Sequence, residues 1–209
     1  MHISAEDRAR RIKIILFDVD GVLTDGSIWL FPAAAAVQSD AKSVSAISSA
    51  GMVEAKGFNA HDGTAISMAR IAGLKCGFIT KRVSETVALR ARDLKMEFLY
   101  MGQAYKMQAV REIMAKENVS LDEIAYVGDD IIDLPVMRRC GLAIAVANAR
   151  EQVKAAGHFT TENSGGHGAG RDAVDFILKA KGVLDEVIEK YIDERNPLPA
   201  SMDIGKGNA

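Results

Sequence analysis

The sequence of 209 residues has little of what would assign it to an oxidising compartment, a membrane or nucleic acid. Its two cysteines, Cys76 and Cys140, lie far apart without metal-site spacing, so we expect reduced packing residues. No window approaches the roughly 20 apolar residues of a membrane helix, and the N-terminus lacks a secretion signal. A net charge of −2 gives no electrostatic basis for binding nucleic acid or an anionic membrane. We therefore expect a cytoplasmic protein.

What the chain does have is the composition of a globular domain, with 48% hydrophobic and 26% charged residues. Apolar runs alternate with amphipathic segments, which predicts an α/β fold, a parallel sheet between two layers of helices. Strands are predicted at Ile12–Phe17, Leu74–Thr80, Glu97–Tyr100, Glu123–Gly128 and Leu142–Val146, with a weaker one at His158–Thr160. Helices are predicted at Asp62–Ala72 (with Asp62 as N-cap), Ser84–Leu94, Lys106–Glu117 and Arg171–Tyr191, the last with Gly182 as a weak point.

Two segments interrupt this alternation. Residues 27–60 hold an alanine- and serine-rich stretch between the strand-like segments SIWLF and GMVEAKGF. We interpret them as a β-hairpin excursion with a long tip, not as a second domain. Residues 196–209 contain enough Pro and Gly to predict a poorly ordered tail. We therefore expect a single domain over residues 1–195.

Asp18 and Asp20 follow the first predicted strand, in ILFDVDGVLTDG. Residues two apart on an extended chain point the same way, and Gly21 allows a sharp turn close to a ligand. Two adjacent carboxylates shift each other's pKa values apart, so one stays ionised while the other can carry a proton. This suits Asp18 as a nucleophile that forms an aspartyl-phosphate and Asp20 as the general acid and base. The pair alone is equally consistent with a loop that contains capping acids.

Three more carboxylates follow another predicted strand, in GDDIIDLPVM: Asp129, Asp130 and Asp133. Acid clusters at neighbouring strand ends repel unless a hard cation holds them, and oxygen ligands suit Mg²⁺. Asp133 by itself is also consistent with a helix N-cap. Thr80 at a strand end and Lys106 at a helix start can hold a phosphoryl group, although each is ordinary in isolation.

These four clusters, in order over residues 12–147, resemble the motifs of the haloacid dehalogenase superfamily of phosphohydrolases. The resemblance implies a Rossmann-like core. It also implies Mg²⁺ bound through Asp18, the Asp20 backbone carbonyl and Asp129, and we add Asp130 as a candidate ligand. The short spans between the motifs leave no room for a large cap domain.

Finer features resemble one subfamily, the 3-deoxy-D-manno-octulosonate 8-phosphate phosphatases of lipopolysaccharide precursor synthesis. They are LTDG, FNAHDGTAI, the pair Arg82 and Ser84, YMGQAYK and GGHGAGRD. The resemblance implies a capless homotetramer with a sugar-phosphate substrate, in which hairpins equivalent to residues 27–60 form the subunit interface. Four departures stand outside the four motifs: Lys81 replaces a glycine, His61 stands where Arg is frequent, GAGRD differs from GAVRE, and the tip of the excursion is longer than expected.

Arg82 is a candidate for substrate recognition, because a guanidinium binds a sugar-acid carboxylate through two parallel hydrogen bonds. Without the resemblance, a solvated arginine is equally consistent with the sequence. Lys81, His61 and Gly21 are further candidates for contact with substrate. The segment GGHGAGR, residues 165–171, predicts an anion site at a helix N-terminus, a tight turn or an oligomer contact.

Several alternatives remain at this stage. Related members of the family act on nine-carbon sugar-acid phosphates. A signalling domain of receiver type also groups acids, a Thr and a Lys around Mg²⁺, but Asp20 supplies the proton transfers that turnover requires. A subunit that keeps the fold only for assembly is disfavoured by four intact motifs.

Overall fold

The computed structural model describes residues 3–32 and 52–195, and the predicted hairpin tip and C-terminal tail lie outside these ranges. The strands are β1 (Ile14–Phe17), β2 (Trp29–Pro32), β3 (Met52–Ala55), β4 (Lys75–Ile79), β5 (Phe98–Tyr100), β6 (Ile124–Gly128), β7 (Leu142–Ala145) and β8 (Phe159–Thr160). The α-helices are α1 (Ala5–Ala9), α2 (Ala60–Ile71), α3 (Glu85–Asp93), α4 (Lys106–Glu117), α5 (Leu134–Met137), α6 (Glu151–Lys154), α7 (Ala169–Ala180) and α8 (Leu184–Ile192).

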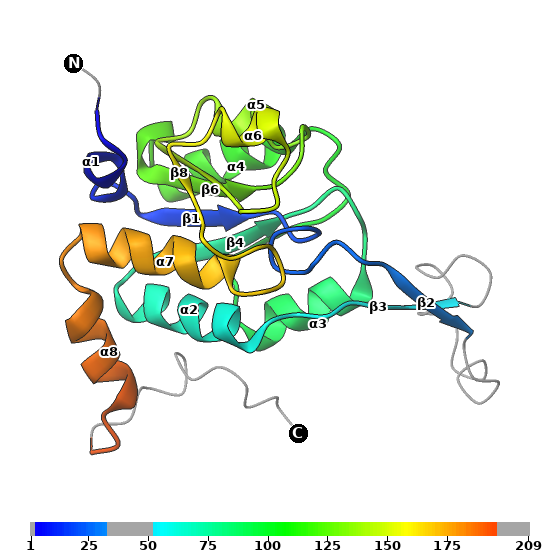
Figure 1. The fold of residues 1–209 in the computed structure, drawn as a ribbon, viewed down its shortest axis with the longest axis horizontal. Coiled ribbons are helices and arrows are strands. Elements are labelled where there is room, and N and C mark those ends of the chain that lie inside the picture. The colour runs from blue at the N-terminus through cyan, green and yellow to red at the C-terminus, as the bar shows by residue number, and fades with distance from the viewer. Residues whose placement is uncertain (1–2, 33–51, 196–209) are drawn as a thin grey trace.

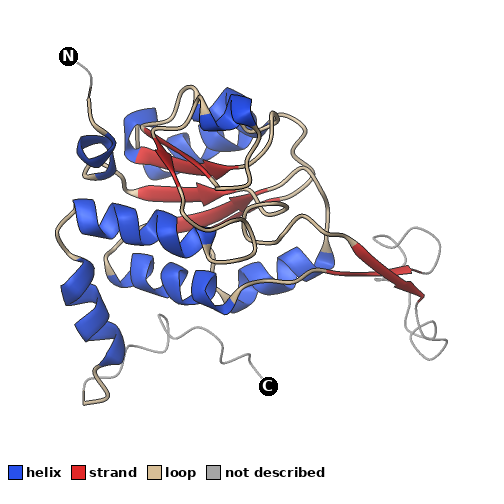
Figure 2. Ribbon diagram, viewed as in Figure 1, coloured by secondary structure: helices blue, strands red, loops and turns tan. Residues whose placement is uncertain are grey.

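The central layer is a six-stranded parallel sheet in the order β5-β4-β1-β6-β7-β8. Helices α2, α3 and α7 lie on one side of it and α4, α5 and α6 on the other (Figure 1). Figure 2 shows the strands in red between the two blue helical layers. The predicted three-layer α/β/α arrangement is confirmed, and the described residues contain no large cap domain.

The strand order places the candidate site residues together, just beyond the carboxyl ends of the central strands. After β1 the chain builds β4 and β5 on one side, and it later builds β6, β7 and β8 on the other. In open parallel sheets, ligands bind beyond the carboxyl ends of the strands at such a switch point. Phe17, the last residue of β1, pairs with Phe78 and Val127 of the flanking strands, so the residues that follow all three strands are neighbours.

The predicted hairpin is present. Strands β2 and β3 pair antiparallel, with Trp29 opposite Ala55 and Phe31 opposite Val53, and they project away from the sheet (Figure 1). Glu54 and Lys56 are two residues apart on the returning arm of this ribbon, so their side chains lie on the same face of it. The base of β3 runs directly into the residues before α2.

Two helix predictions were wrong in detail. Helix α2 begins at Ala60, because Asn59 is its N-cap and accepts a hydrogen bond from the His61 amide at 2.8 Å. Asp62 is instead buried. The single long helix predicted from residue 171 is two helices, α7 and α8, because Gly182 between them has a φ of +72°. A left-handed residue ends a helix, and glycine adopts that conformation at little cost.

The core is built from the strands and the inner faces of the helices. All four residues of β1 and all four of β7 are buried, as expected for strands covered on both faces. Helices α2 and α7 pack against each other on the face of the sheet that they cover together with α3 (Figure 1). None of the helices in residues 3–32 and 52–195 has both the length and the apolarity needed to span a membrane.

Candidate active site

Asp18 lies at the centre of the site because β1 ends one residue before it. Its amide donates to the Val127 carbonyl at 3.0 Å, which fixes the backbone to β6. One carboxylate oxygen accepts a hydrogen bond from the Val19 amide at 2.7 Å, and the side chain is 5% exposed. The backbone at the strand end is thus tied to β6, and the carboxylate is held by the Val19 amide and the Lys106 ammonium, so it has little freedom to turn away.

Lys106 is fully enclosed at the first residue of α4. Its ammonium Nζ lies 2.8 Å from Asp18 Oδ2 and 2.7 Å from Asp133 Oδ1, and its side chain is 1% exposed. A buried ammonium is stable only when it is paired, and here two carboxylates flank it. Burial alone would lower the pKa of Lys106, but the charges of Asp18 and Asp133 raise the pKa above its ordinary value. The lysine is therefore a fixed positive charge.

Asp133 is fully buried and has more partners than a helix cap requires. Its Oδ1 accepts hydrogen bonds from Lys106 and, at 2.7 Å, from the hydroxyl of Tyr126. Its Oδ2 accepts from the backbone amides of Asp129 and Asp130 at 3.1 and 3.3 Å. Although it occupies the N-cap position of α5, its side chain makes no capping hydrogen bond to that helix. Asp133 thus fixes both Lys106 and the loop that carries Asp129.

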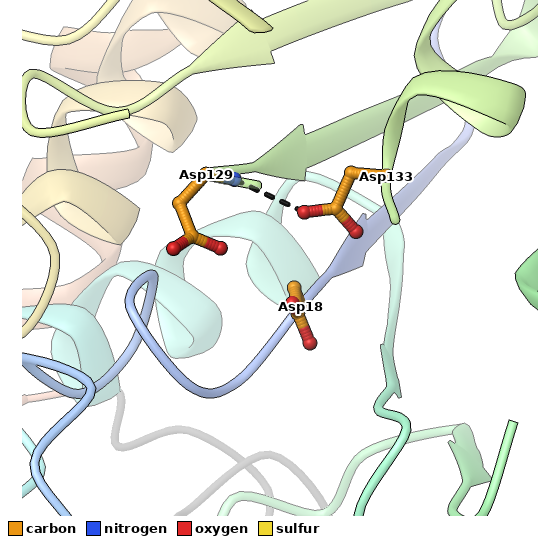
Figure 3. A group of neighbouring side chains, drawn as sticks. All are labelled: Asp18, Asp129 and Asp133. Atoms are coloured by element: carbon orange, nitrogen blue, oxygen red, sulfur yellow. Dashed lines mark hydrogen bonds between the residues drawn. The ribbon is translucent and has the colours of Figure 1, made fainter. Parts of the chain in front are cut away.

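Asp18, Asp129 and Asp133 converge in space (Figure 3). One carboxylate oxygen from each lies within 4.8 Å of the others. Burial, followed by the charges of neighbouring carboxylates, raises the pKa of Asp129 to about 7. The pKa of Asp18 also rises to about 7, chiefly through burial, and the Lys106 charge opposes this rise.

The cluster fits a hard divalent cation. Asp129 Oδ1 is buried and has no hydrogen-bond partner among the described residues, a costly state for a carboxylate oxygen unless a ligand completes it. Asp18 and Asp129 together supply the anionic oxygen ligands that Mg²⁺ prefers. Each oxygen of Asp133 accepts from two protein donors, whereas each oxygen of Asp18 has one, so Asp133 supports the site and is the less suitable ligand.

Two of the predicted metal-binding residues have their carboxylates elsewhere. Asp130 is exposed, and its Oδ1 accepts a hydrogen bond from the Ile131 amide. The Asp20 carboxylate faces Lys56, whose Nζ lies 2.5 Å from Asp20 Oδ1. The structure therefore does not group the carboxylates of Asp20 and Asp130 with Asp18 and Asp129.

Gly21 is required by the approach of Asp129. It has a φ of +86°, and a Cβ at this position would lie 2.1 Å from Asp129 Oδ2. The loop is braced from behind by Gly165, where a Cβ would lie 1.7 Å from the Gly21 carbonyl oxygen. The amide of Gly166 donates to the Val22 carbonyl at 3.1 Å. Part of GGHGAGR is therefore a tight turn that supports the loop after β1.

A second group of charges adjoins the first and joins the hairpin to the site. Arg82 Nη2 lies 2.7 Å from Glu54 Oε2, and Arg82 Nε lies 3.9 Å from Asp20 Oδ2. Ser84 donates to Glu54 Oε1 at 2.6 Å. Lys56 Nζ lies 3.5 Å from that same oxygen, and the Lys56 side chain is completely buried. We call Asp20, Glu54, Lys56, Arg82 and Ser84 the outer network.

The other predicted site residues have different surroundings. Thr80 is buried directly after β4, and its hydroxyl oxygen accepts a hydrogen bond from the Arg82 amide at 3.3 Å. Lys81 is exposed beside it. His61 is exposed in the first turn of α2. Thr80 thus lies at the same end of the sheet as Asp18. Lys81 and His61 belong neither to the cluster of Asp18, Asp129 and Asp133 nor to the outer network.

Comparisons with known proteins place this arrangement in a family. A family model described as haloacid dehalogenase-like hydrolase matches residues 80–170. The 3-deoxy-D-manno-octulosonate 8-phosphate phosphatase of Escherichia coli K12 is 35% identical over 179 residues, which cover 86% of this chain and 86% of that protein. The chain belongs to the haloacid dehalogenase-like hydrolases. The resemblance inferred from the four motifs is confirmed.

Solved structures of this hydrolase family agree. The crystal structure of the 3-deoxy-D-manno-octulosonate 8-phosphate phosphatase from Yersinia pestis is 34% identical and has a TM-score of 0.75, covering 87% of this chain and 88% of that one. The phosphatase of the same name from Moraxella catarrhalis, in complex with magnesium ion, phosphate ion and KDO, is 32% identical with a TM-score of 0.77. That match covers 90% of this chain and 97% of the other.

Sequence reasoning about this hydrolase missed three residues. Glu54 and Lys56 stood in a segment interpreted only as a strand, and their partners are distant in the sequence. Glu54 pairs with Arg82, 28 residues away, and Lys56 pairs with Asp20, 36 residues away. Asp62 was interpreted as a cap of its own helix, but its Oδ1 accepts from the Arg171 amide of α7 at 2.9 Å. The available signal was FNAHDGTAI, in which a buried acid stands among apolar helix positions. Asp62 therefore occupies the helix N-terminus where GGHGAGR, in one of its three interpretations, would bind an anion.

Proposed function

We propose that this hydrolase is a Mg²⁺-dependent phosphatase that acts on a sugar-acid phosphate, with 3-deoxy-D-manno-octulosonate 8-phosphate as its substrate in lipopolysaccharide precursor synthesis. The observation that carries the proposal is the buried ammonium of Lys106 between Asp18 and Asp133, beside the unpartnered oxygen of Asp129. The relatives named above bear this activity in their names, and the Moraxella catarrhalis protein was crystallised with magnesium, phosphate and KDO. A nine-carbon sugar-acid phosphate is the alternative substrate.

In the proposed reaction, an Asp18 carboxylate oxygen attacks phosphorus and the bond from phosphorus to the sugar oxygen breaks. Asp20 donates a proton to the departing sugar oxygen, and the phosphoryl group remains on Asp18 as an aspartyl-phosphate. Asp20 then takes a proton from water as the water attacks phosphorus. The bond between phosphorus and Asp18 breaks, so phosphate leaves and both carboxylates return to their starting state.

The remaining site residues hold the phosphoryl group. Lys106 presents a fixed positive charge, and the Thr80 hydroxyl and the backbone near Gly21 supply hydrogen bonds. Mg²⁺, held by Asp18, Asp129 and the Asp20 carbonyl, neutralises phosphate charge when it is bound. The raised pKa values of Asp18 and Asp129, each about 7, mark two carboxylates that a nearby cation would keep ionised.

Recognition of the sugar acid is assigned to the outer network. Arg82 is 44% exposed, so its guanidinium can bind a carboxylate that approaches from solvent. Lys81 and His61 are exposed and are proposed to contact the sugar of the bound substrate. Phosphate esters without a carboxylate lack this contact, so Arg82→Ala should impair them less than a sugar-acid phosphate.

The direct test is release of phosphate from 3-deoxy-D-manno-octulosonate 8-phosphate and from a generic aryl phosphate, with and without Mg²⁺. Asp18→Asn should abolish release from both, and Asp20→Asn should lower kcat roughly 10²- to 10⁴-fold, the usual contribution of a general acid and base. Circular dichroism checks that both variants keep the fold. A protein that becomes labelled with phosphate but never turns over would contradict the proposal and favour a signalling domain.

We further propose a homotetramer that works in the cytoplasm. Association is supported by the exposed apolar side chains of the hairpin, since Trp29, Leu30 and Phe31 are each more than half exposed in the single chain. Exposed apolar patches of this kind mark interaction surfaces. A reducing compartment is supported by Cys76 and Cys140, which are both free and buried.

A further inference from the structure

Arg82 is the residue to which the proposed function assigns recognition of the substrate carboxylate. Its guanidinium already forms an ion pair with the carboxylate of Glu54. Glu54 Oε2 lies 2.7 Å from Arg82 Nη2, and Glu54 Oε1 accepts a hydrogen bond from Ser84 at 2.6 Å. The backbone carbonyl of Glu54 accepts a further hydrogen bond from Thr86 at 3.0 Å. Strand β3 is thereby fastened to the start of α3, and the Glu54 side chain is only 18% exposed.

The Glu54 carboxylate places a negative charge within the outer network. Burial would raise the pKa of Glu54, but hydrogen bonds from Ser84 and Arg82 and the charge of Lys56 hold it below its ordinary value. Glu54 is therefore ionised at neutral pH. The Glu54 carboxylate faces two cations, Lys56 at 3.5 Å and Arg82 at 2.7 Å, so it offsets positive charge that would otherwise attract a second anion.

We infer that Glu54 is a specificity-determining residue, which a substrate carboxylate displaces when it binds to the Arg82 guanidinium. This inference rests on the proposed function. The exchange replaces one ion pair of Arg82 with another, so Arg82 adds less affinity for an acidic sugar than an unpaired arginine would. Removing the negative charge of Glu54 frees the guanidinium and increases the preference for substrates that carry a carboxylate.

The test compares KM values for two phosphate esters, 3-deoxy-D-manno-octulosonate 8-phosphate and the neutral sugar ester glucose 6-phosphate. Glu54→Gln keeps the length of the side chain and an oxygen that can accept from Ser84. The KM ratio, glucose 6-phosphate over the sugar-acid ester, should rise roughly two- to fivefold, the range expected for one partly exposed ion pair. In an Arg82→Ala background, Glu54→Gln should no longer move the ratio, because its effect acts through the guanidinium.

Glu85→Gln is the matched control, because it removes the same charge from an exposed position in the first turn of α3. It should leave the KM ratio unchanged. Glu54→Asp is a second variant that keeps the charge but withdraws it from Arg82, and it should raise the ratio by a smaller factor. Its result decides the question if Glu54→Gln does not fold.

Three outcomes would overturn the inference: an unchanged ratio in Glu54→Gln, a lower ratio, or a rise that persists in Arg82→Ala. Failure of the proposed function looks different, because the wild-type enzyme would then hydrolyse neither ester and the inference would fall with it. If the wild-type enzyme hydrolyses the sugar-acid ester but Glu54→Gln does not raise the ratio, the proposed function stands and the role of Glu54 is wrong.

Discussion

Asp18, Asp129 and Asp133 carry the same side chain, and their surroundings make them three different groups. Asp133 has hydrogen-bond donors for both oxygens. Asp18 is held by one amide and one ammonium. Asp129 keeps an oxygen without a partner. Local partners, not residue type, therefore separate a supporting carboxylate from the two that we propose as metal ligands.

Gly21→Ala should lower the activity of the enzyme in addition to the stability that its backbone conformation costs. A Cβ at Gly21 would collide with Asp129 at 2.1 Å, whereas at Gly26, with a φ of +83°, the nearest atom is at 3.6 Å. Both substitutions place alanine in a left-handed conformation, at a cost of about 1–2 kcal/mol. Only Gly21→Ala should also lower kcat/KM, by roughly tenfold or more, because it displaces a site carboxylate. Equal kcat/KM losses in Gly21→Ala and Gly26→Ala would contradict this explanation.

At the scale of elements, the contact between α2 and α7 includes one buried carboxylate. Asp62 on α2 accepts a hydrogen bond from the N-terminal turn of α7, where an anion is favoured. Its second oxygen is buried without a hydrogen-bond partner in the part of the chain that the structure describes. Burial raises the pKa of Asp62 from 3.8 to about 6, so burial outweighs the contribution of the helix amides.

The raised pKa of Asp62 predicts that the free energy of unfolding depends on pH. Because its pKa is higher in the folded state, the folded protein binds the proton more tightly than the unfolded chain does. The free energy of unfolding should therefore fall as pH rises from about 4 to about 6, by about 1–3 kcal/mol, and then level off. Urea unfolding of the wild type and Asp62→Asn, both in a metal chelator, isolates this contribution as their difference. A difference that does not vary with pH would show that Asp62 is not the group responsible.

Helix ends were the least predictable elements, and each error has a local cause. The sequence indicates an acid near the start of α2, but only the packing of α7 shows that Asp62 faces another helix. Gly182 was identified as a weak point, and its left-handed φ makes it a break. Long apolar runs such as Ile14–Phe17 were predicted well, because burial on both faces requires continuous apolar sequence.

At the scale of the whole molecule, cation binding should stabilise the fold. A ligand that binds only the folded state adds about 2.7 kcal/mol at one hundred times its Kd, which raises Tm by roughly 5–10 °C for a chain of this size. Asp129→Asn should abolish the rise in Tm with Mg²⁺. Asp130→Asn should retain it, because the Asp130 carboxylate is exposed and lies outside the cluster. If both variants lost the Mg²⁺-dependent rise in Tm, Asp130 would also have to be a ligand.

The proposed tetramer predicts a measurable change in mass. Phe31→Glu places a charge on the exposed apolar face of β2, so light scattering after gel filtration should show a smaller species than the wild type. Ile192→Glu is the control, since Ile192 is 59% exposed on α8, which lies at the opposite end of the molecule from the hairpin (Figure 1). A wild-type monomer, or a Phe31→Glu protein of unchanged mass, would contradict the assignment of this surface.

The sequence by itself determined the parallel sheet and the four motifs, because strand burial and the positions of residues after strands are local properties of the chain. Only the tertiary structure decided how the acids are partnered. Asp133 became the partner of Lys106, and Asp20 became the partner of Lys56, across separations of 27 and 36 residues. Electrostatic pairing depends on distance in space, which sequence spacing does not encode. The fold therefore had to bring β1, β6, α4 and the hairpin together before these charges had defined neighbours.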